Sequence, residues 1–294
     1  MRSCGPSRTA LAAAAHRGVH QVLERGRIFN DALALPILGD GAATLVEEAR
    51  QRVEGRDMRL FIAARTRFAE DALCSAFQRG ARQLVILGAG LDTYAYRGSL
   101  RGSLRIFEVD HPATQTWKRA RLMAAGITVP ASLKFAPLDF ERQSLAEVLG
   151  AAGFDQTVPT YFTWLGVVPY LPLGAVSATL TYVAGLPGGS HLVFDYAEPP
   201  ESLSPAARAL HEQRASRVEA LGEPWRTYLS PGELHGKLSS LGFRSLVDAR
   251  ARALVSHYLG KALTRSGEGP GHVLLAATVA GACIRNFAAV PSVG

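Results

Sequence analysis

Short runs of apolar residues alternate with longer segments of mixed polarity along most of the chain. The clearest run, at 83–87, passes directly into Gly88-Ala89-Gly90. A continuous apolar run of this length predicts a strand that is buried on both faces, as in a parallel sheet. Six further strands are predicted at 104–110, 133–140 including the exit of the strand, 159–165, 190–196, 242–247 and 272–279.

Between these runs, apolar residues recur at helical spacing. The clearest case spans 57–79, where Leu60, Phe61, Ala64, Phe68 and Ala72 fall near the 3.6-residue period. Because strands and helices alternate and no linker is long enough to divide the chain, we expect one α/β domain. Other helices are predicted at 9–16, 111–125, 204–221 and 230–241, two of them with Pro112 or Pro231 in the first turn.

Composition and charge narrow the possible partners. The chain has 294 residues, 48% of them hydrophobic, which is enough for a large core. No apolar run is long enough for a membrane span, so we expect a soluble, cytoplasmic protein. The net charge is +7, but arginines are interleaved with acids and form no dense basic run, which argues against nucleic-acid binding. The basic segment 1–25 superficially resembles a transit peptide, but its Ala-rich part predicts a helix and we interpret it as structure.

Three cysteines are too few and too far apart for a metal or disulfide framework. Cys4, Cys74 and Cys283 form no CxxC pair. This pattern is typical of a reducing compartment, and it predicts neither a structural disulfide nor a zinc site.

The Gly-Ala-Gly turn predicts a ligand site. Glycines at 88 and 90 let backbone N–H groups face a bound group directly, and a nucleotide is the natural occupant. A dinucleotide fingerprint would carry a third glycine where this chain has Thr93, which argues against NAD. About twenty residues on, Glu108 and Asp110 share one face of a strand and could accept hydrogen bonds from ribose hydroxyls. A solvated strand end is the alternative interpretation of either acid.

Two sequence blocks carry a family resemblance. Residues 87–93 followed by 95–97, and 107–110 followed by Pro112, resemble the S-adenosylmethionine-dependent methyltransferases related to leucine carboxyl methyltransferase and to polyketide carboxyl O-methyltransferases. Similarity continues at 64–68, at Phe154 with Pro159, at 164–167 with 170–172, and at 222–225. The resemblance implies a Rossmann-like class I fold with a seven-stranded, mostly parallel sheet, helices on both faces and an N-terminal helical cap at 1–80. It also implies a core at 81–282 with a helical lid insertion around 198–230, and a tail at 283–294.

The same resemblance implies S-adenosyl-L-methionine as cofactor and assigns site residues. Arg65 would meet the methionyl carboxylate, although a solvated arginine is the alternative. Asp139 would face adenine or only shape a turn, and Trp225 would wall the substrate site or pack in the core. The implied cofactor-binding set is Arg65, Gly88, Ala89, Gly90, Asp92, Thr93, Glu108, Asp110, Leu138, Asp139 and Trp164, and the implied substrate-binding set is Arg59, Tyr170, Tyr196 and Trp225.

The methyl acceptor is less defined than the cofactor. Leu165 stands where many relatives have Glu, and Tyr94 where Arg is common, which leaves the substrate class open. We expect O-methylation of a carboxyl or hydroxyl group on a small secondary metabolite. A carboxylate needs no base, whereas a hydroxyl would benefit from one, and His111 and His235 are nominal candidates that could equally be surface or packing histidines.

Three other functions stay open at this point. A protein C-terminal carboxylate is the next acceptor, favoured if Arg59 or Arg65 is free to bind it. A non-catalytic cofactor-binding protein and an NAD-dependent oxidoreductase lie outside that class. No metal-ligand spacing is present in the sequence, and the sequence gives no indication of oligomeric state.

Overall fold

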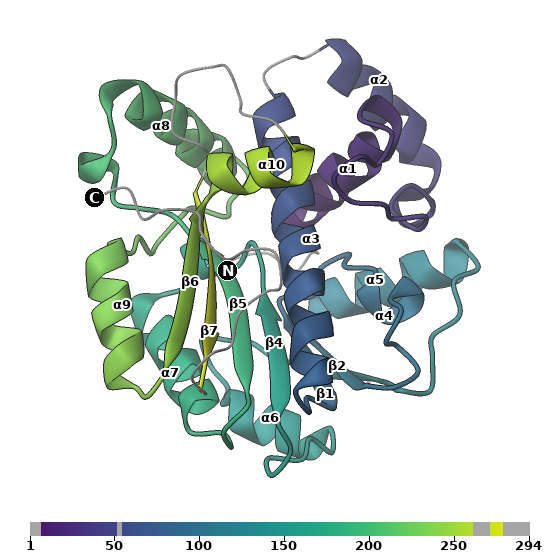
Figure 1. Cartoon of the computed structure of the whole chain (residues 1–294). Helices are drawn as coiled ribbons and strands as arrows, with labels where there is room; N and C mark the ends of the chain where they lie inside the picture. Colours follow the sequence, from purple (N-terminus) through teal and green to yellow (C-terminus); the bar gives the residue numbers. More distant parts are fainter. Residues whose placement is uncertain (1–6, 52–54, 261–270, 279–294) are drawn as a thin grey trace.

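A seven-stranded sheet lies at the centre of the computed structural model, which describes residues 7–51, 55–260 and 271–278 (Figure 1). The strand order is β3-β2-β1-β4-β5-β7-β6, and only β7 runs antiparallel to its neighbours. This confirms the predicted mostly parallel α/β sheet. The strands are β1 (Gln83–Leu87), β2 (Arg105–Asp110), β3 (Leu133–Pro137), β4 (Thr160–Trp164), β5 (His191–Tyr196), β6 (Ser245–Arg250) and β7 (His272–Ala277).

Each central strand is buried on both faces because helices cover both sides of the sheet. Along β5, Leu192 and Phe194 join one core cluster while Val193 joins the other. The first cluster packs under α6 (Leu145–Ala151), α7 (Leu173–Ala184) and α9 (Pro231–Ser240), and the second under α3 (Arg56–Gln78) and α10 (Ala251–Leu259). The alternation follows from the two-residue period of a strand. All-apolar strands such as β1 therefore need this double cover.

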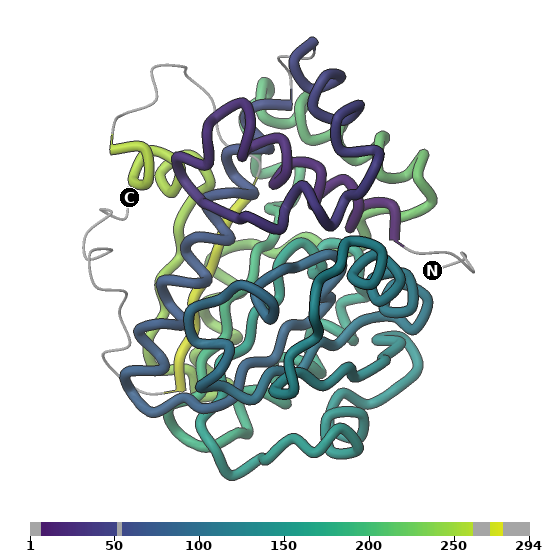
Figure 2. The backbone as a smooth tube through the Cα atoms, turned by 90° about the vertical axis from the view of Figure 1, so that its right-hand side faces the viewer, coloured from purple at the N-terminus to yellow at the C-terminus, as the bar shows by residue number. Residues whose placement is uncertain are grey.

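The N-terminal helices form the predicted cap. Helix α1 (Arg8–Leu23), the 3-10 helix η1 (Pro36–Gly41) and α2 (Ala42–Gln51) lie above the central strands, in purple and blue in Figure 2. Ala14 and Ile37 pack there against Leu91 and Leu122, from the loop after β1 and from α5 (Pro112–Ala124). The cap therefore rests on the edge of the sheet where ligands bind in doubly wound folds.

Several boundaries differ from the sequence-based expectation. Strand β6 begins at Ser245, later than the predicted 242, because Leu241–Phe243 form the turn that ends α9. Helices α2, α6, α7 and α10 were not expected, and α7 lacks a clear polar face. Some predicted features lie outside the described residues, namely Cys4, Cys283, residue 279 and the tail 283–294. Within the described residues, Cys74 is a free, exposed thiol. The remaining elements are α4 (Tyr94–Arg97), η3 (Val168–Tyr170), η4 (Pro200–Ser202) and α8 (Pro205–Ala220).

His191 gives the fold a measurable dependence on pH. It opens β5 at 1% exposure, and burial together with Arg79 lowers its pKa to about 4. The unfolded chain, with an ordinary histidine pKa of about 6.5, takes up this proton first, so the His191 contribution to stability is lost as pH falls from 6.5 toward 4. We therefore expect the stability difference between wild type and His191→Gln to change by about 2 kcal/mol between pH 7 and pH 5.

Urea denaturation of both proteins at several pH values measures this difference. Substitution of the exposed His257 by Gln is the matched control, and it should leave the pH dependence of stability unchanged. A His191→Gln profile that runs parallel to that of wild type would show that His191 is not held neutral by the fold.

Candidate functional site

The Gly-Ala-Gly turn lies where the strand order changes direction, between β1 and β4. Gly88 and Gly90 have φ values of 65° and 46°, which L side chains rarely adopt. A Cβ atom at Gly88 would lie 2.2 Å from Cγ2 of Val167, and one at Gly90 would lie 3.1 Å from Cβ of Ala10. The turn therefore requires glycine at both positions, and it sits at the topological switch point where doubly wound sheets bind nucleotides.

Asp110 is fixed beside this turn at the end of β2. Its carboxylate accepts a hydrogen bond from the Gly90 N–H at 2.5 Å and one from the His111 N–H at 2.6 Å. Burial raises the pKa of this carboxyl, and the two backbone donors oppose that shift. A carboxylate can accept about four hydrogen bonds, so two backbone donors leave capacity for the hydroxyls of a ribose. Asp110 and the turn thus fit a nucleoside.

Glu108, two residues earlier on β2, lies in a buried ion pair. It is 1% exposed, and its carboxylate is 2.7 Å from Nζ of Lys118 and accepts from the Tyr96 hydroxyl. Burial raises its pKa to about 7, and Lys118 opposes the shift. The structure therefore gives Glu108 a partner inside the protein, and its binding to a cofactor stays a prediction.

Arg65 and Asp195 join three elements at the sheet edge. The Arg65 guanidinium on α3 donates to Asp195 on β5 at 2.5 Å, and Asp195 also accepts from the Gly166 N–H, just after β4, at 2.5 Å. Arg65 is 8% exposed, and its Nε atom is buried with no hydrogen-bond partner within 7–51, 55–260 and 271–278. This free donor fits the carboxylate of an amino-acid-like ligand.

Arg59, the second predicted arginine, forms an ion pair with Glu24 of the N-terminal cap. Its guanidinium donates twice to Glu24, at 2.7 Å each, and is 4% exposed. His20 and Arg59 in turn lower the pKa of Glu24 to about 2. Arg59 is therefore an internal clamp between α1 and α3 in this structure.

Asp92 and Thr93 continue the turn and attach it to the cap. Asp92 accepts from the Tyr94 N–H at 2.7 Å, which opens α4. The Thr93 hydroxyl donates to the buried Asp31 at 2.7 Å, and Arg97 bridges the same Asp31 at 3.1 Å. A dinucleotide fingerprint would have its third glycine at position 93. In this chain that position is Thr93, which connects the turn to the cap through its hydrogen bond to Asp31.

The remaining predicted cofactor residues differ in exposure. Leu138 is buried and its N–H donates to the Asp110 carbonyl at 2.8 Å, so it lies next to the turn. Asp139 accepts a hydrogen bond from the Glu141 N–H at 3.0 Å. This contact stabilises a turn, which was the alternative to adenine binding for this residue. Trp164 is fully buried, 6.4 Å from the Phe140 ring, and belongs to the core cluster under α7. Of these three residues, Leu138 is hydrogen-bonded directly to Asp110.

The first turn of α1 covers the glycine turn and is fastened from across the molecule. Ala10 lies against Gly90, as described above. Glu223, 8% exposed in the loop after α8, accepts from the N–H groups of Arg8 and Thr9 at 2.7 and 3.2 Å and from the Ser7 and Thr9 hydroxyls. A carboxylate at a helix N-terminus satisfies free N–H groups and the positive end of the helix dipole.

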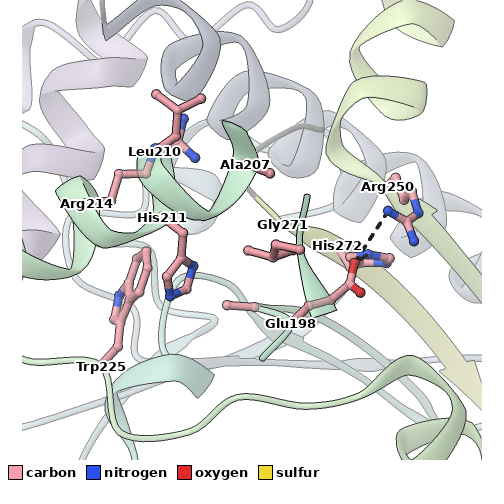
Figure 3. A pocket seen from close by; sticks show the side chains of 11 residues that line it. Glu198, Ala207, Leu210, His211, Arg214, Trp225, Arg250, Gly271 and His272 are labelled. Carbon is pink, nitrogen blue, oxygen red and sulfur yellow. Dashed lines mark hydrogen bonds and ion pairs between the residues drawn. The ribbon is translucent and has the colours of Figure 1, made fainter. Parts of the chain in front are cut away.

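An open pocket lies farther along the same edge, between α8, the end of β5 and the start of β7 (Figure 3). It is a shallow hollow that opens to solvent, and the space of about 520 Å³ within its outline includes that open solvent. The rings of Trp225 and Tyr228 lie 5.0 and 5.2 Å from the ring of His211. The pocket is lined by Ala197, Glu198, Leu203, Ala207, Leu210, His211, Arg214, Trp225, Arg250, Gly271 and His272.

Of the four predicted substrate residues, Trp225 lines this pocket, whereas Arg59, Tyr170 and Tyr196 do not. Tyr196 is 2% exposed, its hydroxyl donates to Asp248 at 2.5 Å, and its ring stacks on that of the lining residue His272 at 4.9 Å. Tyr170 on η3 is partly buried, and burial raises its pKa. The nominal base His235 pairs with Asp248 at 2.8 Å, whereas His111 caps α5 by accepting from the Ala113 N–H.

The pocket contains a positively charged side chain, Arg214, that was not among the site residues predicted from the sequence. Arg214 is half-buried, and no carboxylate of the described chain lies within ion-pair distance of it. Burial lowers its pKa, as expected for a cation without a close partner. Arg250 is 3.6 Å from Glu198, which pairs with His272 at 2.5 Å. The sequence feature that could have indicated this pair is the three-residue spacing of His211 and Arg214, which places both side chains on one face of α8.

The two departures from the family pattern lie together. Tyr94 and Leu165 both line a second pocket of about 290 Å³ between α3 and the sheet, with Glu70 and Asp92. Tyr94 is 5% exposed and packs in the core cluster beneath α3. The two substitutions therefore act on one place in the structure.

Among residues 7–51, 55–260 and 271–278 no helix combines the length and apolar character that a membrane crossing needs. The same ranges contain no group of three or more histidine, cysteine or acidic side chains placed to hold a metal ion.

Comparisons with known proteins agree with this geometry. The sequence model of the leucine carboxyl methyltransferase family matches residues 10–184. YktD of Bacillus subtilis (strain 168), provisionally described as an S-adenosyl-L-methionine-dependent methyltransferase, is 36% identical over 181 residues, covering 61% of this chain and 59% of YktD. A protein of Mycobacterium sp. (strain JLS) with the same description is 34% identical over 201 residues, covering 68% and 60%. The chain thus spans about 60% of the length of the curated relatives it matches.

Solved structures share the fold. A protein from Thermobifida fusca YX, provisionally described as a methyltransferase, aligns with a TM-score of 0.54 at 16% identity, covering 93% of this chain and 95% of that one. A protein of the duf574 family from Streptomyces avermitilis aligns with a TM-score of 0.53 at 14% identity, covering 90% and 97%. At this identity the likeness concerns architecture alone.

The contact between Glu223 and α1 can be tested by Glu223→Gln. Gln keeps the shape but loses the charge, so the bonds to Arg8, Thr9 and Ser7 weaken. We expect a loss of about 2 kcal/mol in unfolding free energy and faster amide hydrogen exchange in the first turns of α1. Glu219→Gln, on an exposed position of α8, is the matched control. Equal stability and exchange in both variants would show that Glu223 does not fasten the cap.

Proposed function

Because the chain belongs to the leucine carboxyl methyltransferase family, we propose that it transfers the methyl group of S-adenosyl-L-methionine to an oxygen atom of a small anionic molecule. The observation that carries the acceptor class is the open pocket beyond β5, lined by Trp225, His211 and the cation Arg214, which has no carboxylate within ion-pair distance among the described residues. A half-buried guanidinium without a carboxylate partner favours an anionic ligand. The acceptor oxygen belongs to a carboxyl or a hydroxyl group.

The cofactor would occupy the edge between the glycine turn and Arg65. The N–H groups and missing side chains of Gly88 and Gly90 admit it closely, Asp110 would accept from its ribose hydroxyls, and Arg65 Nε would donate to its carboxylate. When bound, it supplies an electrophilic methyl group. The protein then has to orient the acceptor oxygen and exclude water, and α1 with Glu223 already covers the turn.

The alternatives have less support in the geometry. A protein C-terminal carboxylate would need a free arginine at position 59 or 65, but Arg59 donates twice to Glu24, and the remaining donor of Arg65 is the one proposed to bind the cofactor carboxylate. An NAD-dependent oxidoreductase would need room at position 93, where Thr93 donates to Asp31. Cofactor binding without transfer would leave the acceptor pocket and Arg214 without a role. A small acceptor therefore fits these contacts best.

Calorimetric titration with S-adenosyl-L-methionine, S-adenosylhomocysteine and NAD tests the cofactor. We expect micromolar binding of the first two, no binding to Gly90→Arg, and about 10- to 100-fold weaker binding to Asp110→Ala, which loses charge-assisted hydrogen bonds. Gly174→Arg and Asp40→Ala, both at exposed positions, are the controls and should bind as wild type does. Binding of NAD alone would overturn the proposal.

The anionic acceptor is tested separately on the protein saturated with S-adenosylhomocysteine. Benzoate should bind, its neutral isostere benzamide should bind more weakly, and Arg214→Gln should reduce benzoate affinity about tenfold or more while leaving cofactor affinity unchanged. Arg217→Gln, one turn along α8 at an exposed position, is the charge-matched control. If Arg214→Gln and Arg217→Gln bind benzoate equally, the anion does not bind at Arg214.

A further inference from the structure

We propose that His211 is the general base of the acceptor pocket and that the acceptor is a hydroxylated aromatic acid, held through its carboxylate by Arg214 and methylated on its hydroxyl oxygen. This inference rests on the proposed function, since it concerns the same pocket. It decides between the carboxyl and the hydroxyl oxygen, which the family relationship leaves open.

The first observation is an unpartnered nitrogen atom. His211 is 7% exposed, and its Nε2 atom is buried with no hydrogen-bond partner in the part of the chain that the structure describes. An unsatisfied buried nitrogen costs about 1–3 kcal/mol, so a site that retains one is suited to a ligand that supplies the missing bond. Figure 3 shows the imidazole extending from α8 beside Trp225 in the pocket wall.

The second observation is the charge state of the ring. Burial and the neighbouring Arg214 both lower the pKa of His211, whereas Glu212 raises it less. The imidazole is therefore neutral at pH 7 and has a lone pair to accept a proton. The other charged groups of the pocket neutralise one another, because Glu198 pairs with His272 and Arg250. Arg214 and Nε2 of His211 are therefore available to a ligand, and His211 is the one of the two that can accept a proton.

Their placement matches one ligand with two polar ends. His211 and Arg214 are three residues apart on α8 and both line the pocket. Trp225 lines the pocket beside His211, with the two ring centroids 5.0 Å apart, which favours a flat aromatic body. A ligand carrying only a carboxylate would use Arg214 and leave the nitrogen of His211 unpaired. A ligand that also carries a hydroxyl uses both.

The chemical step balances without any further reagent. The hydroxyl proton passes to Nε2 of His211, and the acceptor oxygen gives an electron pair to the methyl carbon. The bond between that carbon and sulfur breaks, and its electron pair stays on sulfur. The products are an aryl methyl ether, S-adenosylhomocysteine and an imidazolium that releases its proton to water. A hydroxyl needs this base near neutral pH because its own pKa is close to 10.

The probes that test the proposal are 4-hydroxybenzoate and 3-hydroxybenzoate, with benzoate as the acceptor that lacks the hydroxyl. On the protein saturated with S-adenosylhomocysteine, calorimetry should show at least one hydroxybenzoate binding more tightly than benzoate, and His211→Phe should remove this preference. With S-adenosyl-L-methionine, mass spectrometry and NMR should identify the methoxybenzoate and not the methyl ester.

The catalytic role is tested by His211→Gln through its pH profile. At pH 7 the rate of ether formation should fall at least about 100-fold, with unchanged S-adenosylhomocysteine affinity and thermal stability showing that the variant folds. Between pH 7 and 9 the variant should recover about tenfold per unit, since the ionised fraction of the phenol rises by that factor. A merely structural role would not produce this recovery. The exposed His257→Gln is the matched control and should keep the wild-type rate.

Each outcome separates the two proposals. If S-adenosylhomocysteine does not bind, the proposed function fails. If it binds but the methyl group goes to the carboxylate, if no hydroxybenzoate binds or reacts, or if His211→Gln keeps the wild-type pH profile, this inference is overturned while the methyltransferase proposal stands. Ether formation that depends on His211 at pH 7 and recovers at pH 9 without it supports the inference.

Discussion

The ion pair between Arg65 and Asp195 holds the functional edge of this protein together. It joins α3 to β5 across 130 residues of sequence, and the Gly166 N–H adds the exit of β4 to the same carboxylate. Buried charges are tolerated only when they are paired, so the three elements are bound to a fixed relative position. Val167, the residue after Gly166, lies against Gly88 of the glycine turn, and Ala197, two residues after Asp195, lines the open pocket. The ion pair therefore joins the segments that lead to the turn and to the pocket.

The fold could be predicted from the sequence because its signals are local. An apolar run that ends in Gly88-Ala89-Gly90 specifies a buried strand and a turn with positive φ, and both depend on a few adjacent residues. The unexpected helices show the limit of this approach. Helix α7 is apolar on most of its surface, so it lacks the polar face that identifies a helix by periodicity, and β6 was placed too early because Leu241–Phe243 belong to the preceding turn.

The site could be predicted only in part because ion pairing depends on residues far apart in the chain. Nothing near Arg59 in sequence indicates that Glu24 will take up its charge, and nothing near Glu108 separates a buried pair with Lys118 from a ligand contact. His211 and Arg214 were missed for the same reason. On an isolated α8 they look like solvated residues, and only packing against Trp225 and the end of β5 turns them into pocket walls.

The match to the family model ends at residue 184, whereas every residue that lines the open pocket beside α8 lies at position 197 or later. The chain is therefore divided in sequence as well as in space, with the glycine turn and Asp110 before the boundary and α8 and its following loop after it. The two parts are nevertheless linked, because Glu223 and Asp195 from the second part bind α1 and α3 of the first. Side chains that line the pocket and make neither contact, such as Arg214, can therefore change while the glycine turn and the helix that covers it stay in place.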